Sequence, residues 1–354
     1  MLNFFTKRGE QVARRIILGI ILGGLILFSC FYYSRNNPWE NRYSEMQPLM
    51  GTTAQVDVCA AGLAKQTREE AYQEVWARLR DISWRMNIFD ENSDVAKINN
   101  ALGKAVVVRK DTYQVLQKAV QFSYLTQGAF DITIWPLMRL WKEGQENNQI
   151  PTQERIKEVL KAIGSPNIEL LANNQVKLPN PQTKIDLGGI AAGFALDQAA
   201  HIFRKHGIQN FYIDIGGDIY AGGKNCAGRP WRIGIRSPQD KSKMIDIVLV
   251  SNASITTSGN YEKNFHIQGE QWSHIMDPRT GYPQKEVISA TVIAPTGIEA
   301  DAFATAVCVL GSKEGSDFID RLGKKYASLV LVPMPDQGLS EYPSIFYEKF
   351  RLKK

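Results

Sequence analysis

The sequence has few of the residues that bind zinc or exchange disulfides. It contains four histidines and four cysteines among 354 residues, and no two cysteines form a CxxC pair. A zinc site is therefore not expected, and a redox-active cysteine pair is absent. Cys59 and Cys308 stand in apolar stretches and are interpreted as buried core thiols. An oxidising compartment would permit a disulfide, but the sequence does not identify a pair.

Beyond residue 40 the sequence also lacks any block of lysine and arginine with interleaved aromatic residues. The net charge of +6, from 42 basic and 36 acidic side chains, is mild. A nucleic-acid-binding surface is therefore not expected. Internal repeats and low-complexity segments are absent as well. The chain is 44% hydrophobic and 22% charged, which is typical of a globular protein with a sizeable core.

The N-terminal region predicts a membrane attachment. Residues 16–33 form an apolar run without a charged side chain, and basic residues predominate before it. As a helix this run would be about 27 Å long, enough to cross the hydrocarbon core of a bilayer. The basic flank is expected to stay in the cytoplasm, as residues 1–15, and to direct the rest of the chain to the periplasm. The sequence thus predicts a protein anchored in the inner membrane.

The end of this run allows a second interpretation. Residues 27–30, LFSC, resemble a lipobox, in which cleavage before Cys30 leaves a lipid-modified N-terminus. Phe28 is bulky where that motif prefers a small or β-branched residue, and the apolar run continues to Tyr33. We therefore favour an uncleaved anchor over a lipoprotein signal. Residues 34–48 are polar and predict a linker, and residues 49–354 are expected to form the periplasmic domain.

Helix-like and strand-like segments follow the linker in mixed order. Helices are expected at 68–89, 110–126, 152–163, 191–206, 299–310 and 313–322. Strands are expected at 53–60, 167–177, 183–187, 211–215, 231–236, 245–250, 287–294 and 327–333. Because strands and helices do not alternate strictly, the pattern predicts an α+β fold with mixed sheets and packed helices.

Two glycine-rich segments are candidates for ligand contact. KIDLGGIAAGFALDQAA, residues 184–200, would end a strand and open a helix through a tight turn. Gly188, Gly189 and Gly193 would let the backbone approach a ligand, and the N–H groups at the helix start suit phosphate. The segment matches neither a dinucleotide fingerprint nor a P-loop, and such a turn is often only a connection. FYIDIGGDIYAGG, residues 211–223, is equally well explained as a hairpin.

Two further segments carry side chains that could act in catalysis or bind a metal. His274 stands on an expected short strand within WSHIMDPRTGYP, residues 272–283, and taken alone it would be a core histidine. Asp301 and Thr305 are one helical turn apart and share a face. A carboxylate, a hydroxyl and nearby carbonyl oxygens suit Mg²⁺, although Asp301 alone could simply begin a helix.

Taken together and in order, these segments resemble the FAD:protein FMN transferases, the ApbE family. The resemblance runs from about Met50 to beyond Gly311. It depends on several segments in register rather than on any one of them. The matching segments are MGT (50–52), FDENS (89–93), GAFDIT (128–133), PL and LW (136–137 and 140–141), DLGGIAAG (186–193), GGD (216–218), HIMDPRTG (274–281) and ADAFAT (300–305).

The resemblance implies a flavin transferase that uses Mg²⁺, or Mn²⁺ in its place, to move FMN from FAD to a threonine of another protein. His274 would act as general base. The cation would be held by the carbonyl of Gly189 and by Asp301 and Thr305. The FAD contacts implied are Met50, Phe89, Ala129, Phe130, Asp131, Asp186, Ala192 and Ile275. Family members often carry Lys or Glu at position 192, so Ala192 removes a charged contact near the adenosine or the phosphates.

The resemblance leaves other functions open. The same cation and the same bond would serve an FAD pyrophosphatase, in which water replaces the threonine. A non-catalytic flavin-binding lipoprotein is a second alternative, against which the Asp301 and Thr305 pair argues. A redox flavoprotein fits poorly, because nothing marks a nicotinamide site. The acceptors implied by the family are subunits of membrane redox complexes, such as the sodium-translocating NADH:quinone reductase.

Overall fold

The computed structural model describes residues 38–354, apart from positions 61, 241, 261–263, 336–337 and 354. The anchor predicted at residues 16–33, with Cys30, lies outside the described residues. Within them, no helix is both long and apolar enough to cross a bilayer. The chain divides into two units, Met1–Arg42 and Tyr43–Lys354, and the second contains every residue predicted for the site.

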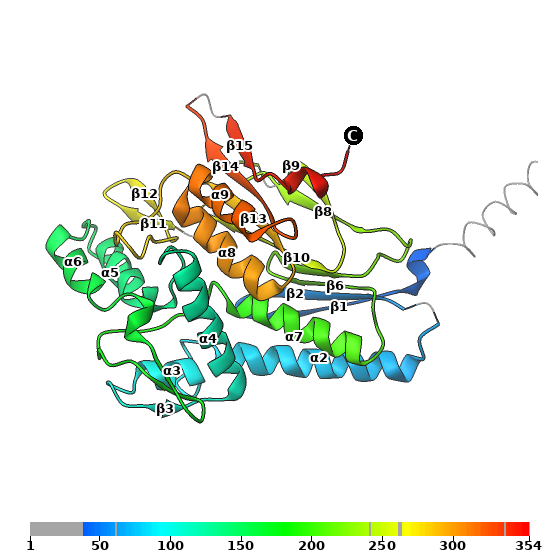
Figure 1. Cartoon of the computed structure of the whole chain (residues 1–354), viewed down its shortest axis with the longest axis horizontal. Helices are drawn as coiled ribbons and strands as arrows, with labels where there is room; N and C mark the ends of the chain where they lie inside the picture. The colour runs from blue at the N-terminus through cyan, green and yellow to red at the C-terminus, as the bar shows by residue number, and fades with distance from the viewer. Residues whose placement is uncertain (1–37, 61, 241, 261–263, 336–337, 354) are drawn as a thin grey trace, which may run out of the picture. The chain divides into compact units, whose positions relative to one another are not determined.

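An eight-stranded sheet forms the centre of the second unit, in the order β1-β2-β6-β7-β10-β13-β14-β15 (Figure 1). Neighbouring strands from β2 to β15 are antiparallel. The strands are β1 (Arg42–Leu49), β2 (Thr52–Cys59), β6 (Phe211–Ile215), β7 (Asp218–Gly222), β10 (Ala253–Gly259), β13 (Ser289–Ala294), β14 (Ala327–Pro333) and β15 (Leu339–Pro343).

Helices cover one face of this sheet in strand order. α7 (Ala191–Lys205) contacts β6 and β7, α8 (Gly297–Leu310) contacts β10 and β13, and α9 (Ser312–Leu322) contacts β14 and β15. α2 (Lys65–Arg85) packs on α7, and Figure 1 shows these two helices side by side. The helix layer places the start of α7 against the first turns of α8.

The opposite face of the sheet is buried by a hairpin of β8 (Trp231–Arg236) and β9 (Met244–Val250). Along β13, Val292 points into the core under the helices and Ile293 into the core under the hairpin. This alternation follows from the two-residue period of a strand. Because both faces are buried, β13 is buried at every position, including its Ser and Thr residues.

A third apolar cluster joins α5 (Trp135–Glu146) and α6 (Gln153–Leu160) to the hairpin of β11 (Asn264–Ile267) and β12 (Glu270–Ser273). Trp141 is fully buried there, 5.1 Å from the ring of Trp272. The remaining elements are η1 (Pro38–Asn41), α3 (Asp94–Asn99), β3 (Val106–Val107), α4 (Lys110–Leu125), η2 (Ile132–Ile134), η3 (Ser165–Asn167), β4 (Glu169–Leu171), β5 (Gln175–Lys177) and η4 (Tyr347–Lys349).

The predicted α+β fold is confirmed, with antiparallel sheets and packed helices, but some predicted elements were wrong. Residues 183–187 form no strand: the N–H of Asp186 donates to the Ile132 carbonyl (2.7 Å) and that of Ile185 to the Asn99 side chain (2.8 Å). The strand predicted at 167–177 is the short hairpin β4–β5. The helix predicted to reach Phe89 ends at Arg85, and the Asn87 side chain accepts from the Phe89 N–H in the turn that follows.

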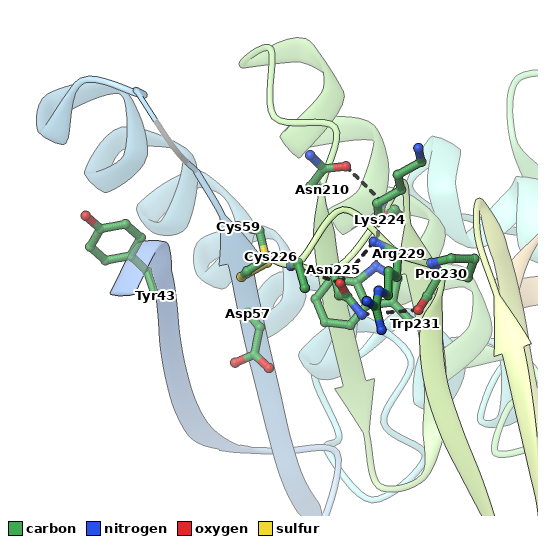
Figure 2. Close-up of a disulfide and its surroundings, with 12 residues drawn as sticks. Tyr43, Asp57, Cys59, Asn210, Lys224, Asn225, Cys226, Arg229, Pro230 and Trp231 are labelled. Carbon is green, nitrogen blue, oxygen red and sulfur yellow. Dashed lines mark hydrogen bonds between the residues drawn. A yellow bond between two sulfur atoms is a disulfide. The ribbon is translucent and has the colours of Figure 1, made fainter. Parts of the chain in front are cut away.

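A disulfide joins Cys59, at the end of β2, to Cys226 in the loop after β7 (Figure 2). The interpretation of Cys59 as a buried free thiol was therefore wrong, because only the fold brings two cysteines 167 residues apart into contact. For Cys308 the prediction is confirmed: its thiol is free and buried, and burial raises its pKa to about 12.

Candidate functional site

The predicted cation ligands meet where α7 begins beside α8. Gly189 lies in the turn before α7, and Thr305 lies in α8. A Cβ atom built on Gly189 would stand 3.2 Å from the Thr305 hydroxyl oxygen and 3.6 Å from the ring of Phe130. The structure therefore places Gly189 close to the side chains of both Thr305 and Phe130, although Gly189 and Thr305 are 116 positions apart in the sequence.

Asp301 lies one turn before Thr305 on α8 and faces the start of α7. Its carboxylate accepts a hydrogen bond from the Gly193 N–H (2.9 Å), and its side chain is buried. Burial, together with the negative charge of Asp218, raises the pKa of Asp301 well above its usual range. In the part of the chain that the structure describes, Asp301 forms no ion pair. A buried carboxylate of this kind is stabilised by a nearby cation.

The alignment of α8 with α7 depends on a close backbone contact and on a carboxylate of α7 that caps the start of α8. Gly193 was predicted to approach a ligand, but its open side faces the backbone of Gly297, which leaves no room for a Cβ. The Asp197 carboxylate, on α7, accepts from the N–H groups of Gly297 (2.6 Å) and Ile298 (3.0 Å) at the start of α8. Burial raises the pKa of Asp197 to about 6, against the lowering effect of these two donors. Asp197 thus fixes the helix that carries Asp301.

The glycine-rich turn is joined to the GAFDIT segment by the Asp186 N–H, which donates to the Ile132 carbonyl (2.7 Å), and each segment is ordered by a carboxylate of its own. The buried Asp131 carboxylate accepts from Ser123 Oγ (2.8 Å) and from the N–H and hydroxyl of Thr133 (2.8 and 2.5 Å). Asp131 therefore holds the backbone of the segment that contains the buried Ala129 and Phe130. The Asp186 carboxylate accepts from the Gly188 N–H (2.9 Å), which orders the turn from the other side.

The predicted general base lies in a constrained loop. His274 is half-buried and occupies a bend directly after β12 rather than a strand position, so that part of the prediction was wrong. Ile275 is buried, and its N–H donates to Ser273 Oγ (3.0 Å). The far end of the loop is held by the Trp141 indole N–H, which donates to the Gly281 carbonyl (3.0 Å). The loop therefore depends on the α5 cluster for its position.

Three residues that are predicted to contact FAD take no part in the contact between Gly189 and Thr305. Met50 occupies the β1–β2 turn in the left-handed region, with φ of 50°, and Ala192 is half-buried in the first turn of α7. Phe89 is 79% exposed, and its ring stands 5.8 Å from that of Trp135 in an edge-on arrangement. This exposure leaves the Phe89 ring available to a ligand.

Sequence reasoning missed two neighbours of the cation ligands. Ser258 Oγ, from β10, lies 3.5 Å from the Thr305 hydroxyl, and nothing in the sequence marks this serine. Asp218 was noticed as part of a turn and of the GGD segment, but not as a neighbour of the cation ligands; Gly216 and Gly217, with φ of 64° and 103°, confirm the β6–β7 hairpin. Among the described residues, no group of three or more His, Cys, Asp or Glu side chains is arranged to hold a metal. A cation here would therefore depend on hydroxyl and carbonyl oxygens as well as on Asp301.

Comparison with known proteins places this geometry in a family. A model of the ApbE family matches residues 50–330. An FAD:protein FMN transferase of Haemophilus influenzae is 31% identical over 310 residues, covering 85% of this chain and 89% of that protein. One of Vibrio cholerae is 30% identical, covering 86% and 92%. An ApbE protein structure from Thermotoga maritima aligns with a TM-score of 0.78 at 31% identity, over 88% of this chain and 100% of that one. The flavin transferase ApbE from Vibrio cholerae aligns with a TM-score of 0.76 at 28% identity, over 87% and 99%.

Proposed function

The chain belongs to the ApbE family, and we propose that it transfers FMN from FAD to a threonine hydroxyl of an acceptor flavoprotein, with Mg²⁺ bound and AMP released. It is an enzyme of the flavin transferase type, as its relatives of about 30% identity are. The proposal of a cation-dependent transfer depends most on the contact of Gly189 with Thr305, one helical turn from the buried Asp301.

The residues at this contact fit a hard cation. Asp301 offers a carboxylate oxygen, Thr305 a hydroxyl and Gly189 a carbonyl, and all three are oxygen donors of the kind that Mg²⁺ and Mn²⁺ accept. Burial, and after it the negative charge of Asp218, raises the pKa of Asp301, and a divalent ion would favour the ionised carboxylate. When bound, the ion would neutralise pyrophosphate charge during the transfer.

The reaction needs one bond to form and one to break. The threonine oxygen of the acceptor attacks the phosphorus of the FMN half of FAD, and the bridging P–O bond breaks, so that AMP leaves with the electron pair. His274 would accept the hydroxyl proton, since a neutral imidazole is a base near neutral pH. The Asp131 and Asp186 hydrogen bonds would keep the glycine-rich turn rigid against the phosphates. Exposed Phe89 would present its ring to the flavin.

We also propose that the catalytic domain faces the periplasm, tethered by residues 16–33 to the inner membrane. The Cys59–Cys226 disulfide supports this location, because such bonds persist in oxidising compartments and are rare in the cytosol. An enzyme tethered there would reach membrane-bound acceptors, such as subunits of the sodium-translocating NADH:quinone reductase.

Intact-mass spectrometry tests the proposal directly. The full chain in detergent is mixed with FAD, Mg²⁺ and a recombinant acceptor domain of such a reductase. A mass gain of one FMN phosphoester on the acceptor, abolished by EDTA, is the expected result. Conversion of FAD to FMN and AMP with no gain on the acceptor would instead identify an FAD pyrophosphatase. FAD that is bound but unchanged would indicate a flavin-binding protein.

A further inference from the structure

Helix α5 has a buried face and an exposed face with a distinct composition. Four residues, at spacings of four, three and four, share the face opposite the buried one; the first is half-buried and the other three are exposed. In order along the helix they are Trp135, Arg139, Lys142 and Glu146. The buried face, formed by Leu137, Leu140 and Trp141, belongs to the third apolar cluster. The exposed face is therefore not needed for the packing of α5.

This face borders a surface hollow of about 470 Å³ between α5, α6 and the turn before the glycine-rich segment. The charged side chains that line it are predominantly basic. Four are positive and two are negative: Arg139, Lys142, Arg155 and Lys184 against Glu143 and Glu146. We call this surface the α5 hollow.

Internal pairing leaves most of the positive charge available. Arg155 binds the Glu143 carboxylate through two nitrogens, at 2.9 and 3.3 Å, so these two charges cancel. Arg139 and Lys142 are exposed, and within the described residues neither forms an ion pair. Lys184 is half-buried and its Nζ donates to the Asn99 carbonyl, so the exposed positive charge comes from Arg139 and Lys142 against Glu146. The hollow therefore presents a net positive field to solvent.

The α5 hollow adjoins the region where the flavin is proposed to bind. Trp135 lines the hollow, and its ring stands 5.8 Å from the exposed ring of Phe89. Lys184 lines it as well, two residues before Asp186. The same two chain segments thus border both the proposed FAD site and the hollow. From Trp135 to Lys142 the helix rises about 10 Å, which is the length of roughly three residues of extended chain.

We propose that the α5 hollow is the docking surface for an acidic segment of the flavin acceptor. This inference rests on the proposed function. Opposite charge would steer the acceptor and hold it beside the FAD site, with the aromatic end of the hollow nearest the flavin. Exposed charges at the rim of an interface mainly raise the rate at which the two proteins associate, and salt screens this effect. Their contribution is therefore seen in the KM for the acceptor and not in the rate of the chemical step.

The test compares two charge-reversed variants of the full chain. R139E/K142E reverses the two exposed cations of the hollow, and K324E/K325E makes the same change in net charge at an exposed turn after α9. Initial rates of FMN transfer are measured against acceptor concentration at saturating FAD, at about 50 and 500 mM NaCl. The same assay is repeated with an acceptor domain whose acidic side chains are replaced by their amides.

At low salt, R139E/K142E is expected to raise the KM for the acceptor roughly tenfold, with kcat and the Kd for FAD within about twofold. High salt, or the amide-substituted acceptor, should remove the difference from the wild type. An unchanged KM, or an equal rise in K324E/K325E, would overturn the proposal. Loss of binding to anionic phosphatidylglycerol vesicles with KM unchanged would assign the hollow to the membrane instead. Absence of transfer by the wild type would contradict the proposed function itself.

Discussion

Gly193 and Gly297 touch through their backbones where α7 crosses α8. A Cβ atom built on Gly193 would lie 2.2 Å from the Gly297 carbonyl oxygen, and one built on Gly297 would lie 2.3 Å from that of Gly193. No side chain fits at these distances, so both positions require glycine for space. The contact also brings the Gly193 N–H to the Asp301 carboxylate, at 2.9 Å. One helix crossing therefore positions the proposed cation site.

Replacement of Gly193 by alanine is expected to separate the two helices. The cost of forcing a methyl group into a packed contact is about 1–3 kcal/mol, and more where backbone must move. We expect a lower melting temperature together with a loss of FMN transfer, measured by thermal unfolding and by acceptor mass. Gly188→Ala is the control, because the nearest atoms to its Cβ would all belong to the Asp186 side chain, the closest an oxygen at 3.3 Å. Equal melting temperatures for the two variants would contradict the prediction.

Loss of the Thr305 hydroxyl should weaken cation binding. Thr305→Val keeps the shape of the side chain and removes the oxygen, whereas Thr305→Ser keeps the oxygen. Mn²⁺ binding, followed by electron paramagnetic resonance, is expected to weaken roughly tenfold in the valine variant, which corresponds to about 1.4 kcal/mol. The serine variant should stay near the wild type. Asp301→Asn should lose both Mn²⁺ binding and transfer, and a fully active Asp301→Asn enzyme would refute the site.

His274→Gln tests the general base. The variant is expected to lower the rate of FMN transfer by about 10²–10⁴-fold, the usual contribution of a positioned base. The Kd for FAD, measured by flavin fluorescence, should change by less than about twofold, since the imidazole acts on the acceptor proton. His266→Gln, at an exposed position of β11, serves as the matched control. Parallel losses of transfer and FAD binding in His274→Gln would rule out the base assignment.

Reduction of the Cys59–Cys226 bond should destabilise the domain. This disulfide joins residues 167 positions apart, and native disulfides contribute about 2–4 kcal/mol to the free energy of unfolding. A reductant is therefore expected to lower the melting temperature of the wild type. It should leave C59S/C226S, already destabilised, unchanged. Since Cys308 is free in both proteins, an equal effect of reductant on both would point to another cause.

The raised pKa of Asp197 predicts that the free energy of unfolding depends on pH. Its pKa is raised to about 6 in the folded protein, above the value of about 3.9 for an unfolded chain. Protonation therefore favours the folded state: the contribution is complete below about pH 4 and is lost as the pH rises through about 6. Between about pH 4 and 7 the wild type should lose on the order of 3 kcal/mol relative to Asp197→Asn. Urea unfolding at several pH values measures this, and parallel stability curves would contradict it.

Much of the local structure could be predicted from the sequence. The helices at 110–126 and 191–206 and the strands at 211–215 and 231–236 agree with α4, α7, β6 and β8 within a few residues. Their apolar periodicity and flanking glycines are local signals. α5 was not predicted, because Trp135 and Pro136 begin it without a side-chain cap and its apolar face packs on distant β11 and β12.

The sequence by itself was enough to predict the family and the candidate site: motif order singled out Gly189, Asp301 and Thr305 as proposed cation ligands, and the comparisons confirmed the family. Only the tertiary structure decided that Gly193 makes room for a helix, that Cys59 pairs with Cys226, and that basic side chains line one hollow with Trp135. The physical reason is how far along the chain each property extends. Residue type and spacing report what a segment can do, whereas close packing, disulfide pairing and summed charge depend on segments brought together from far along the chain.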